Sequence, residues 1–346
     1  MNPVHLQDSF TLDEVDLALV NAVQLQPRAP WTAIGRVLGV DPVTASRRWD
    51  RLAEVGAAWV TCFPLLTPRS VAAVVELDCE PGRTLDVAAA VSADPEVLFV
   101  NIAAGSRDLL LTVAGADTPR LAEYVLRHVG ATPGVARVKT HQVVSVHSEG
   151  GTWTVGALDR QAREALATPT RPFEMSSHLP DDDDWALCDL LAADGRAKAS
   201  TLAQAVGISE PTARRKLDRL SRTGSLRFQV GIAEPISSWP VTAWLFAQLP
   251  ANQVDVVARG LSTFPPLRSA ASVAGPSNLI LQFSLRALDH VHRLEADLEE
   301  RIPNLVITDR AVNLGVAKQL GRLINERGFA TNSTSLRPRQ SYHYNP

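Results

Sequence analysis

One stretch of this chain occurs twice, and the two copies lie 168 positions apart. Gly39 and Gly207 are separated by this distance, and so are Leu52 and Leu220. In each copy a short apolar-patterned segment ends at the glycine, and the polar residue two positions later can cap the start of a second helix. Two short helices joined by such a turn form a helix-turn-helix. The sequence therefore predicts two helix-turn-helix units in one chain.

The second helix of each unit has one apolar face and one basic face. Ala45, Trp49 and Leu52 recur at spacings of four and three residues, so they share one stripe, and the second copy repeats this pattern. Hydroxyl groups near a helix N-terminus, followed by guanidinium groups, suit a helix laid in the major groove of DNA. We therefore predict that the outward residues bind DNA. They are Thr44, Ser46, Arg47, Arg48 and Arg51 in the first copy, and Thr212, Arg214, Arg215, Lys216 and Arg219 in the second.

The alternative interpretation of these faces is a solvated surface, because arginine-rich helix faces are common. The recurrence of the whole unit in the same register favours DNA binding over that alternative. An acidic residue also lies on each face, and we expect it to pair with an arginine of its own helix. The expected pairs are Asp50 with Arg47 or Arg51, and Asp218 with Arg214 or Arg222.

The composition limits the classes of protein that the chain can represent. Its 346 residues are enough for two or more domains, and its net charge of -3 argues against a globally basic coat for nucleic acid. DNA affinity would instead come from local patches such as residues 210–222, where five basic residues outnumber two acidic ones. The three cysteines are far apart and form no Cys-x-x-Cys pair, which is typical of reduced thiols in a cytoplasmic protein.

No segment of the sequence resembles a secretion signal or a membrane span. No apolar run approaches the roughly 20 residues that a span needs, so we expect a cytoplasmic protein with no membrane partner. The acidic run Asp181–Asp184 is either a metal site or a helix N-terminus. Adjacent carboxylates cannot converge on one ion without a tight loop, so the helix N-terminus is the better explanation. We predict no metal ligands, no cofactor and no catalytic residues.

The period of the hydrophobic pattern changes along the chain and divides it into domains. Supporting helices are predicted from Leu12 and over 185–193, and wing strands over 58–63 and 226–230. After each wing, strand and helix patterns alternate as βαββαβ, which is typical of a ferredoxin-like sheet with both helices on one face. The predicted α+β fold has winged helix-turn-helix domains at 11–63 and 181–232, βαββαβ domains at 69–147 and 239–325, a linker at 148–180 and a disordered tail at 331–346.

Three shorter features refine these boundaries. The linker contains a predicted short helix at 158–166, followed by loop-forming residues at 168–172. The apolar segment 316–324 is predicted to be a closing helix. Gly224 lies 168 positions after Gly56, so both glycines are expected to follow the second helix of their units.

The chain resembles the Lrp/AsnC (feast/famine) family of bacterial and archaeal transcription regulators. The resemblance covers roughly residues 11–146 and 180–325. It rests on the opening Leu12-Asp13-Glu14-Val15-Asp16, on Thr44-Ala-Ser-Arg-Arg48, and on the turn Gly105-x-x-Asp108. It implies a winged helix-turn-helix joined to a ferredoxin-like (RAM-type) ligand-sensing domain. Because one chain carries this pair of domains twice, it resembles a covalently linked dimer.

The resemblance also implies partners. The family's paired recognition helices enter successive major grooves of double-stranded DNA, so the expected function is sequence-specific regulation of transcription at the nucleoid. Arg48 aligns with Lys216 and Ser46 with Arg214, and the expected operator is therefore an imperfect palindrome. Relatives assemble into rings or disks, so the tandem chain is expected to form a dimer or tetramer of itself through its sheet edges.

Family members bind amino acids or similar effectors around the Gly-x-x-Asp turn. The resemblance thus assigns effector binding to Gly105, Arg107 and Asp108, and to Gly275 and Asn278 in the second copy. Asp108 can accept an ammonium group, but the second copy has Asn278 in its place. Either only the first copy senses a ligand, or the second copy has drifted to a structural role. A further alternative is that Gly105 to Asp108 is simply a well-formed turn.

Two rival functions remain. A few relatives of this architecture are tetrapyrrole decarboxylases, which bind a carboxylated ring through basic residues and histidines. Five of the eight histidines lie on or near the predicted sheet domains: His128, His141, His147, His290 and His292. The arginines on both recognition helices favour a regulator over such an enzyme. The third function is a module whose helix-turn-helix units contact protein only, and steeply salt-dependent binding to duplex DNA would distinguish it.

Overall fold

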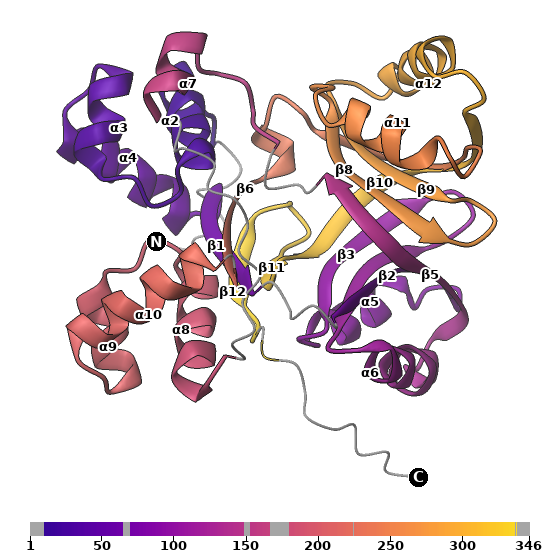
Figure 1. Ribbon diagram of the computed structural model, residues 1–346, viewed down its shortest axis with the longest axis horizontal. Helices are drawn as coiled ribbons and strands as arrows, with labels where there is room; N and C mark the ends of the chain where they lie inside the picture. The colour runs from indigo at the N-terminus through magenta and orange to yellow at the C-terminus, as the bar shows by residue number, and fades with distance from the viewer. Residues whose placement is uncertain are drawn as a thin grey trace. The chain divides into compact units, whose positions relative to one another are not determined.

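The computed structural model describes residues 10–64, 70–148, 153–166, 180–223, 225–335 and 337. The chain divides into two compact units (Figure 1). Of the described residues, the helix-turn-helix unit contains those within 1–69, 154–236 and 319–338, and the sheet unit contains those within 70–153 and 237–318. The loop predicted at 168–172, Gly224 and most of the tail 331–346 lie outside the described residues.

The helix-turn-helix unit contains both copies of the predicted motif. In each copy the first helix of the motif ends at a glycine in the left-handed conformation, Gly39 (φ 67°) or Gly207 (φ 80°). A side-chain cap follows, because Asp41 accepts from the amide of Val43 in the first copy and Ser209 accepts from the amide of Thr212 in the second. The elements are α2 (Glu14–Leu25), α3 (Trp31–Leu38), α4 (Pro42–Glu54) and β1 (Ala58–Pro64), then α8 (Asp182–Ala193), α9 (Ala199–Val206), α10 (Glu210–Arg222) and β6 (Leu226–Ile232).

The predicted wing strands do not form a wing in each copy. Instead β1 and β6 pair with each other as an antiparallel two-stranded sheet, in which Val60 lies opposite Val230. A single strand leaves its backbone donors and acceptors unpaired, and the equivalent strand of the other copy supplies the partner. The two-winged arrangement is therefore not confirmed, although both predicted strands exist.

The segment after the second sheet domain also differs from the prediction. Residues 316–324 do not form a closing helix. Strand β10 (Val306–Gln319) runs on through this region, the chain turns at Leu320 and Gly321 with positive φ, and β11 (Arg322–Ile324) follows. Strand β12 (Ala330–Ser333) pairs with β11, so the tail is ordered at its start rather than disordered from residue 331. The short linker helix is confirmed as α7 (Arg160–Leu166).

The sheet unit confirms the βαββαβ order in both copies. The second helix of the first copy is irregular: it starts as α6, continues as the π-helical turn η1 and ends as the 3₁₀ turn η2. The first copy is β2 (Val71–Cys79), α5 (Thr84–Ser92), β3 (Val97–Ala104), β4 (Leu109–Gly115), α6 (Thr118–Glu123), η1 (Tyr124–His128), η2 (Val129–Ala131) and β5 (Val135–Ser148). The second is β7 (Val241–Gln248), α11 (Val254–Leu261), β8 (Leu267–Ala274), β9 (Leu279–Leu285), α12 (His290–Arg301) and β10.

The strands of the two copies close into one eight-stranded ring. Its order is β10-β3-β4-β2-β5-β8-β9-β7, and β7 pairs back to β10. One apolar cluster takes a residue from every strand of the ring, and separate clusters lie under the helices of each copy. We therefore place the first cluster inside the ring and the helices outside it (Figure 1). The sheet edges that we expected to join separate chains are thus paired within one chain.

None of the helices in the described ranges is long and apolar enough to cross a membrane. The acidic run Asp181–Asp184 forms the N-terminus of α8, as predicted. Asp181 is the N-cap residue, and its side chain and that of Asp184 exchange hydrogen bonds with each other's backbone amide in a capping box.

Candidate nucleic-acid interface and effector site

The apolar stripes of the two recognition helices, α4 and α10, are buried as predicted. Ala45, Trp49 and Leu52 are buried on α4, and Ala213 and Leu220 are buried on α10. The basic residues of both helices therefore lie on faces that turn away from the core. These faces are not uniform, however, because two cations in each copy contact carboxylates of the preceding supporting helix.

In the first copy, Asp13 and Asp16 hold two of the predicted DNA-binding arginines. Arg48 Nη1 lies 2.8 Å from Asp13 Oδ2 and 2.8 Å from Asp16 Oδ1, and Arg51 Nη2 lies 2.5 Å from Asp16 Oδ2. Asp16 is only 1% exposed, and a buried carboxylate is unfavourable without a cationic partner. The hydrogen bonds to Asp13 and Asp16 raise the pKa of Arg48. Both arginines therefore anchor α4 to α2.

The second copy repeats the same contacts at the same offset. Lys216 Nζ lies 2.6 Å from Asp181 Oδ2 and 3.2 Å from Asp184 Oδ1, and Arg219 Nη2 lies 2.6 Å from Asp184 Oδ2. Burial alone would lower the pKa of Lys216, but its hydrogen bonds to these carboxylates raise it. We call the two groups the acid anchors: Asp13 and Asp16 with Arg48 and Arg51, and Asp181 and Asp184 with Lys216 and Arg219.

Sequence reasoning missed the acid anchors, although a signal was present. Asp13 and Asp16 recur as Asp181 and Asp184 at the 168-residue offset, just as the cations do. We assigned Asp181–Asp184 to a helix N-terminus and the cations to DNA, each on local grounds. An acid pair and a cation pair that recur together at one offset indicate a contact between the two helices.

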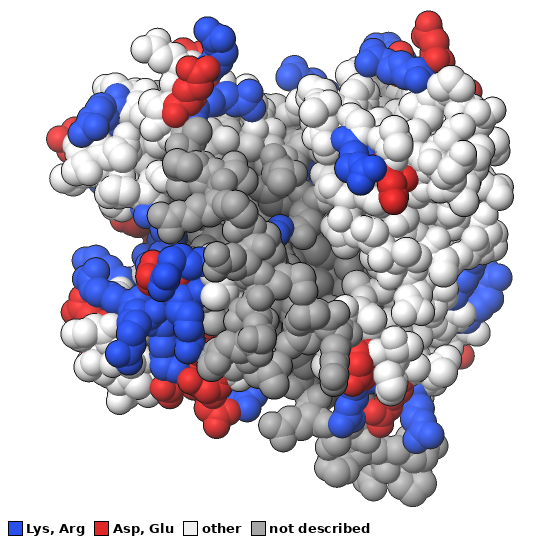
Figure 2. All heavy atoms as spheres, viewed as in Figure 1, with Lys and Arg blue, Asp and Glu red and all other residues white. Residues whose placement is uncertain are grey.

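The remaining predicted residues are more available to a ligand. Within the described ranges, the exposed residues Arg47 and Arg215 make no ion pair. Arg214 bonds to Glu210 on its own helix, with 2.5 Å between Nη2 and Oε1, but its side chain is 69% exposed. Thr44, Ser46 and Thr212 are partly exposed. Figure 2 shows basic side chains gathered over the region of α10.

The two acids on the recognition helices behave differently from each other. Arg222 Nε lies 2.9 Å from Asp218 Oδ2, which confirms one of the two pairings predicted for Asp218. Asp50 makes no ion pair with Arg47 or Arg51 in the described part of the chain, since Arg51 contacts Asp16 instead. The prediction for Asp50 was therefore wrong, because the buried acid is the stronger competitor for that arginine.

The two turns assigned to the effector are fastened to neighbouring strands in the same way. Asp108 Oδ2 accepts from the amide of Cys79 at 2.7 Å. Asn278 Oδ1 accepts from the amide of Leu249 at 3.0 Å, and its Nδ2 donates to the carbonyl of Leu249 at 2.7 Å. Gly105 has a φ of 121°, which favours glycine. These bonds give Asp108 and Asn278 a structural role in the turn, with or without a ligand.

Arg107 belongs to a buried ionic cluster that joins the two copies. Its Nε lies 2.6 Å from Glu76 Oε2, its Nη2 bonds to the carboxylate of Asp309, and its guanidinium lies 4.6 Å from the ring centre of Phe246. Its side chain is only 1% exposed. The prediction that it lies at an open effector site is therefore not supported by its burial. We call Glu76, Arg107, Lys139, His141 and Asp309 the ionic cluster.

Glu76 lies at the centre of the ionic cluster. His141 Nε2 lies 2.5 Å from Glu76 Oε1, and Lys139 Nζ lies 3.2 Å from the same oxygen. Burial alone would raise the pKa of Glu76, but the hydrogen bond from His141 and the charge of Arg107 lower it to about 2. His141 Nδ1 and Arg107 Nη1 are buried and have no hydrogen-bond partner among the described atoms. These two buried nitrogens are the best candidates here to meet a small ligand or a water molecule.

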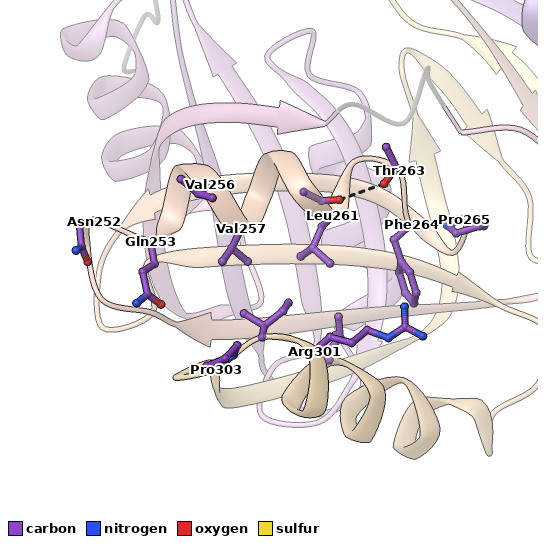
Figure 3. A pocket seen from close by; sticks show the side chains of 13 residues that line it. Asn252, Gln253, Val256, Val257, Leu261, Thr263, Phe264, Pro265, Arg301 and Pro303 are labelled. Carbon is purple, nitrogen blue, oxygen red and sulfur yellow. Dashed lines mark hydrogen bonds between the residues drawn. The ribbon is translucent and has the colours of Figure 1, made fainter.

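The ionic cluster is present once in the described chain and is not repeated at the equivalent positions of the second copy. Allowing for the 170-residue offset between Gly105 and Gly275, Phe246 takes the place of Glu76, Ser277 that of Arg107 and Ala311 that of His141. An apolar groove with a volume of about 740 Å³ lies between α11 and α12 of the second copy (Figure 3). Val257, Leu261, Phe264 and Arg301 are among its lining residues, and the predicted effector residues are not. The two copies therefore share a fold but not a site.

The chain thus contains two N-capped helix-turn-helix motifs and two βαββαβ copies. This combination places it in the class of helix-turn-helix proteins that carry an additional α+β domain. Residues 12–53 and 181–221 match the model of the AsnC-type helix-turn-helix domain, and residues 72–153 match that of the Lrp/AsnC ligand binding domain. The chain belongs to the Lrp/AsnC family, in a form that carries the helix-turn-helix domain twice. Its domains are those of Lrp/AsnC-type transcription regulators.

Similar curated proteins fall into two groups. An uncharacterised HTH-type transcriptional regulator of Pyrococcus horikoshii is 26% identical over 144 residues, which cover 40% of this chain and 90% of the relative. The regulator AldR of Mycolicibacterium smegmatis is 27% identical over 135 residues, which cover 37% of this chain and 79% of AldR. The siroheme decarboxylase NirDL subunit of Paracoccus denitrificans is 26% identical over 310 residues, which cover 86% of this chain and 92% of the relative.

A solved structure has the same fold over both copies. The crystal structure of the siroheme decarboxylase NirDL superposes with a TM-score of 0.57 and 14% identity, covering 89% of this chain and 93% of that chain. The regulators thus match about one copy of the repeat, whereas NirDL is a tandem relative along nearly the whole chain.

Proposed function

We propose that the chain acts as a sequence-specific DNA-binding transcription regulator in which one chain supplies both recognition helices. The observation that carries this proposal is the equivalent placement of Arg47 and Arg215. Each lies on the outward face of an N-capped recognition helix, is exposed and makes no ion pair within the described ranges. A planar guanidinium in this position can reach a guanine edge or a phosphate.

The acid anchors divide the ten predicted DNA-binding residues into two groups. Arg48, Arg51, Lys216 and Arg219 orient the recognition helices, and their charges are largely balanced by carboxylates. Base contacts then fall to the N-terminal part of each helix, namely Thr44, Ser46 and Arg47 in the first copy and Thr212, Arg214 and Arg215 in the second. N-terminal residues of a recognition helix are the ones that meet base edges in helix-turn-helix complexes.

These contacts predict an imperfect palindromic operator. Arg47 and Arg215 are equivalent, which favours a shared base in both half-sites. Two other aligned pairs differ in residue type: Ser46 aligns with Arg214, and Val43 aligns with Pro211. Val43 is 75% exposed. The half-sites are therefore expected to agree at one position and to differ at its neighbours.

The sheet unit is proposed to sense a small molecule, such as an amino acid. The asymmetry of the ionic cluster favours one effector site per chain, beside the first turn at Gly105 and Asp108, rather than two. The turn at Gly275 and Asn278 then has a structural role. We also propose that the chain acts in the cytoplasm at the nucleoid and assembles into a dimer or tetramer. The winged form of each helix-turn-helix domain would require a further strand beside β1 or β6.

The test is DNA binding by the full chain at several salt concentrations. Duplexes selected from a random pool should bind with a logarithmic affinity that falls steeply with the logarithm of salt concentration. Arg47→Gln and Arg215→Gln should each relax base preference at one half-site and weaken binding by about 5- to 150-fold, the range for one bidentate base contact. Arg293→Gln, on an exposed helix of the sheet unit, is the matched control. Salt-independent or undetectable duplex binding would reject the proposal.

A second candidate function is tetrapyrrole decarboxylation. It is favoured by one observation, the similarity to the siroheme decarboxylase NirDL subunit across 310 residues, because the regulators match one copy of the repeat only. The chain would then offer Arg107, Lys139 and His141 as basic groups for carboxylates. Incubation with siroheme under anaerobic conditions, followed by mass spectrometry, distinguishes the candidates. Loss of mass corresponding to CO₂, without selective binding to duplex DNA, would favour the enzyme.

A further inference from the structure

Two arginines join the two helix-turn-helix copies. Arg28 lies in the loop between α2 and α3, and Arg196, 168 positions later, lies in the equivalent loop between α8 and α9. Each guanidinium reaches across and donates to the two carbonyls that flank the other arginine. The bonds run from Arg28 to Gly195 (2.5 Å) and Ala197 (2.9 Å), and from Arg196 to Pro27 (2.5 Å) and Ala29 (2.6 Å). We call this arrangement the arginine clamp.

The arginine clamp places two like charges side by side in a partly buried position. Burial lowers the pKa of Arg28, and burial together with the charge of Arg28 lowers the pKa of Arg196 to about 10. Both groups stay charged at neutral pH, and Asp194 and the four carbonyl oxygens offset their repulsion. A lysine could not hold two carbonyls in this way, because its ammonium lacks the planar fork of a guanidinium.

Backbone contacts beside the clamp join the same two copies. The amide of Gly195 donates to the carbonyl of Val60 in β1 at 2.9 Å. A Cβ on Gly195 would come within 2.4 Å of Val60 Cγ1, so the loop approaches the strand as closely as a glycine allows. Strands β1 and β6 pair along their whole length next to this contact. The copies are therefore joined at the Gly195 loop and along the β1–β6 pair.

A contact path leads from the clamp to a recognition helix. The guanidinium of Arg196, from the second copy, stacks 3.8 Å from the ring centre of Trp31, the first residue of α3. Trp31 in turn packs against Trp49, with 6.4 Å between ring centres, and Trp49 is buried on α4. A residue of the second copy thus supports the helix that reads DNA in the first.

We propose that the arginine clamp fixes the two recognition helices in one mutual orientation, so that the chain accepts a single spacing between half-sites. This inference rests on the proposed function in DNA binding. One added base pair rotates the second half-site by roughly 35° about the duplex, since B-DNA has about 10–10.5 base pairs per turn. A pair of helices that swivels can follow this rotation, whereas a clamped pair cannot. Arg28 and Arg196 are thus positioning residues for operator selection.

The test compares spacing tolerance between matched variants. The duplex selected by the wild-type chain is resynthesised with one, two or five base pairs inserted between its half-sites. Insertion of two base pairs should weaken wild-type binding at least 10-fold. In Arg28→Met/Arg196→Met the same insertion should weaken binding less than 3-fold. The variant Arg259→Met/Arg293→Met removes the same charge from the sheet unit and should stay as strict as the wild type.

A second measurement tests the clamp without DNA. Spin labels on cysteines placed at the exposed positions Thr32 and Thr201, with Cys79 replaced by serine, report the distance between α3 and α9. The wild-type clamp should give one narrow distance distribution, and Arg28→Lys/Arg196→Lys, which keeps both charges, should broaden it. Equal spacing tolerance in wild type and clamp variants, or equally narrow distributions, would overturn the inference. If the wild-type chain gives a narrow distance distribution, the clamp variant gives a broad one and neither binds DNA, the proposed function is rejected and the clamp is not.

Discussion

Asp184→Asn provides a sharp test of the acid anchors. Asp184 is fully buried, and its carboxylate accepts two bonds from Arg219 Nη2, at 2.7 and 2.6 Å, and one from Lys216 Nζ at 3.2 Å. An amide in its place keeps one acceptor oxygen but loses the negative charge. Hydrogen bonds to charged groups contribute about 1.5–3 kcal/mol each. Because the Arg219 side chain is 33% exposed and can turn to water, we expect a net loss near the lower end, about 2 kcal/mol.

Urea unfolding followed by circular dichroism measures this loss, and the chain offers a matched control. Asp183→Asn changes the same charge on the same helical turn, but Asp183 is 43% exposed and 3.5 Å from Lys216. Its substitution should cost less than about 0.5 kcal/mol, as for other surface ion pairs. Equal effects of the two substitutions would refute our account of the anchor. So would an Asp184→Asn protein as stable as the wild type.

Three further predictions concern the core. The free energy of unfolding should fall as the pH is lowered from about 4.5 to 2, because the pKa of Glu76 is held at about 2 only in the folded chain. In unfolding experiments at acid pH, Glu76→Gln should abolish the part of this fall that is due to Glu76. Burial lowers the pKa of Lys318 to about 8 in the folded chain. Between pH 8 and 10.5 the unfolded chain therefore binds more protons than the folded chain, and the free energy of unfolding should rise with pH. Thermal melts of Lys318→Met over this range should lack the rise. Gly195→Ala should lower the melting temperature because of its clash with Val60, whereas Gly260→Ala, in open space on α11, should raise it; the opposite order would contradict the packing.

Much of the fold could be predicted because its determinants are local. The turn glycines, the N-cap residues Asp41 and Ser209 and the alternation of strand and helix periods each act within a few residues. The pairing of strands across the two copies could not be predicted in this way. The contacts of β1 with β6, and of β5 with β8, join residues more than 100 positions apart, and periodicity does not name a distant partner.

The candidate site was harder to predict than the fold. Arg47, Arg214 and Arg215 are exposed as expected, but Arg48 and Lys216 contact carboxylates 35 residues earlier, at Asp13 and Asp181. Burial of Arg107 depends on Phe246 and on the carboxylate of Asp309, which belong to the other copy. Such cross-copy contacts decide whether a polar side chain is available to a ligand. They become visible only when both halves are folded together.

The closed ring of strands has a consequence for how the two halves can diverge. In an assembly of identical subunits every substitution appears on both sides of the twofold axis, so Glu76 would be repeated where Phe246 now lies. Here the halves are encoded separately, and Arg107 can pair with an acid of one half while it stacks on an aromatic ring of the other. Covalent fusion thus releases the interior from symmetry, and one half can specialise in chemistry that the other half only needs to accommodate.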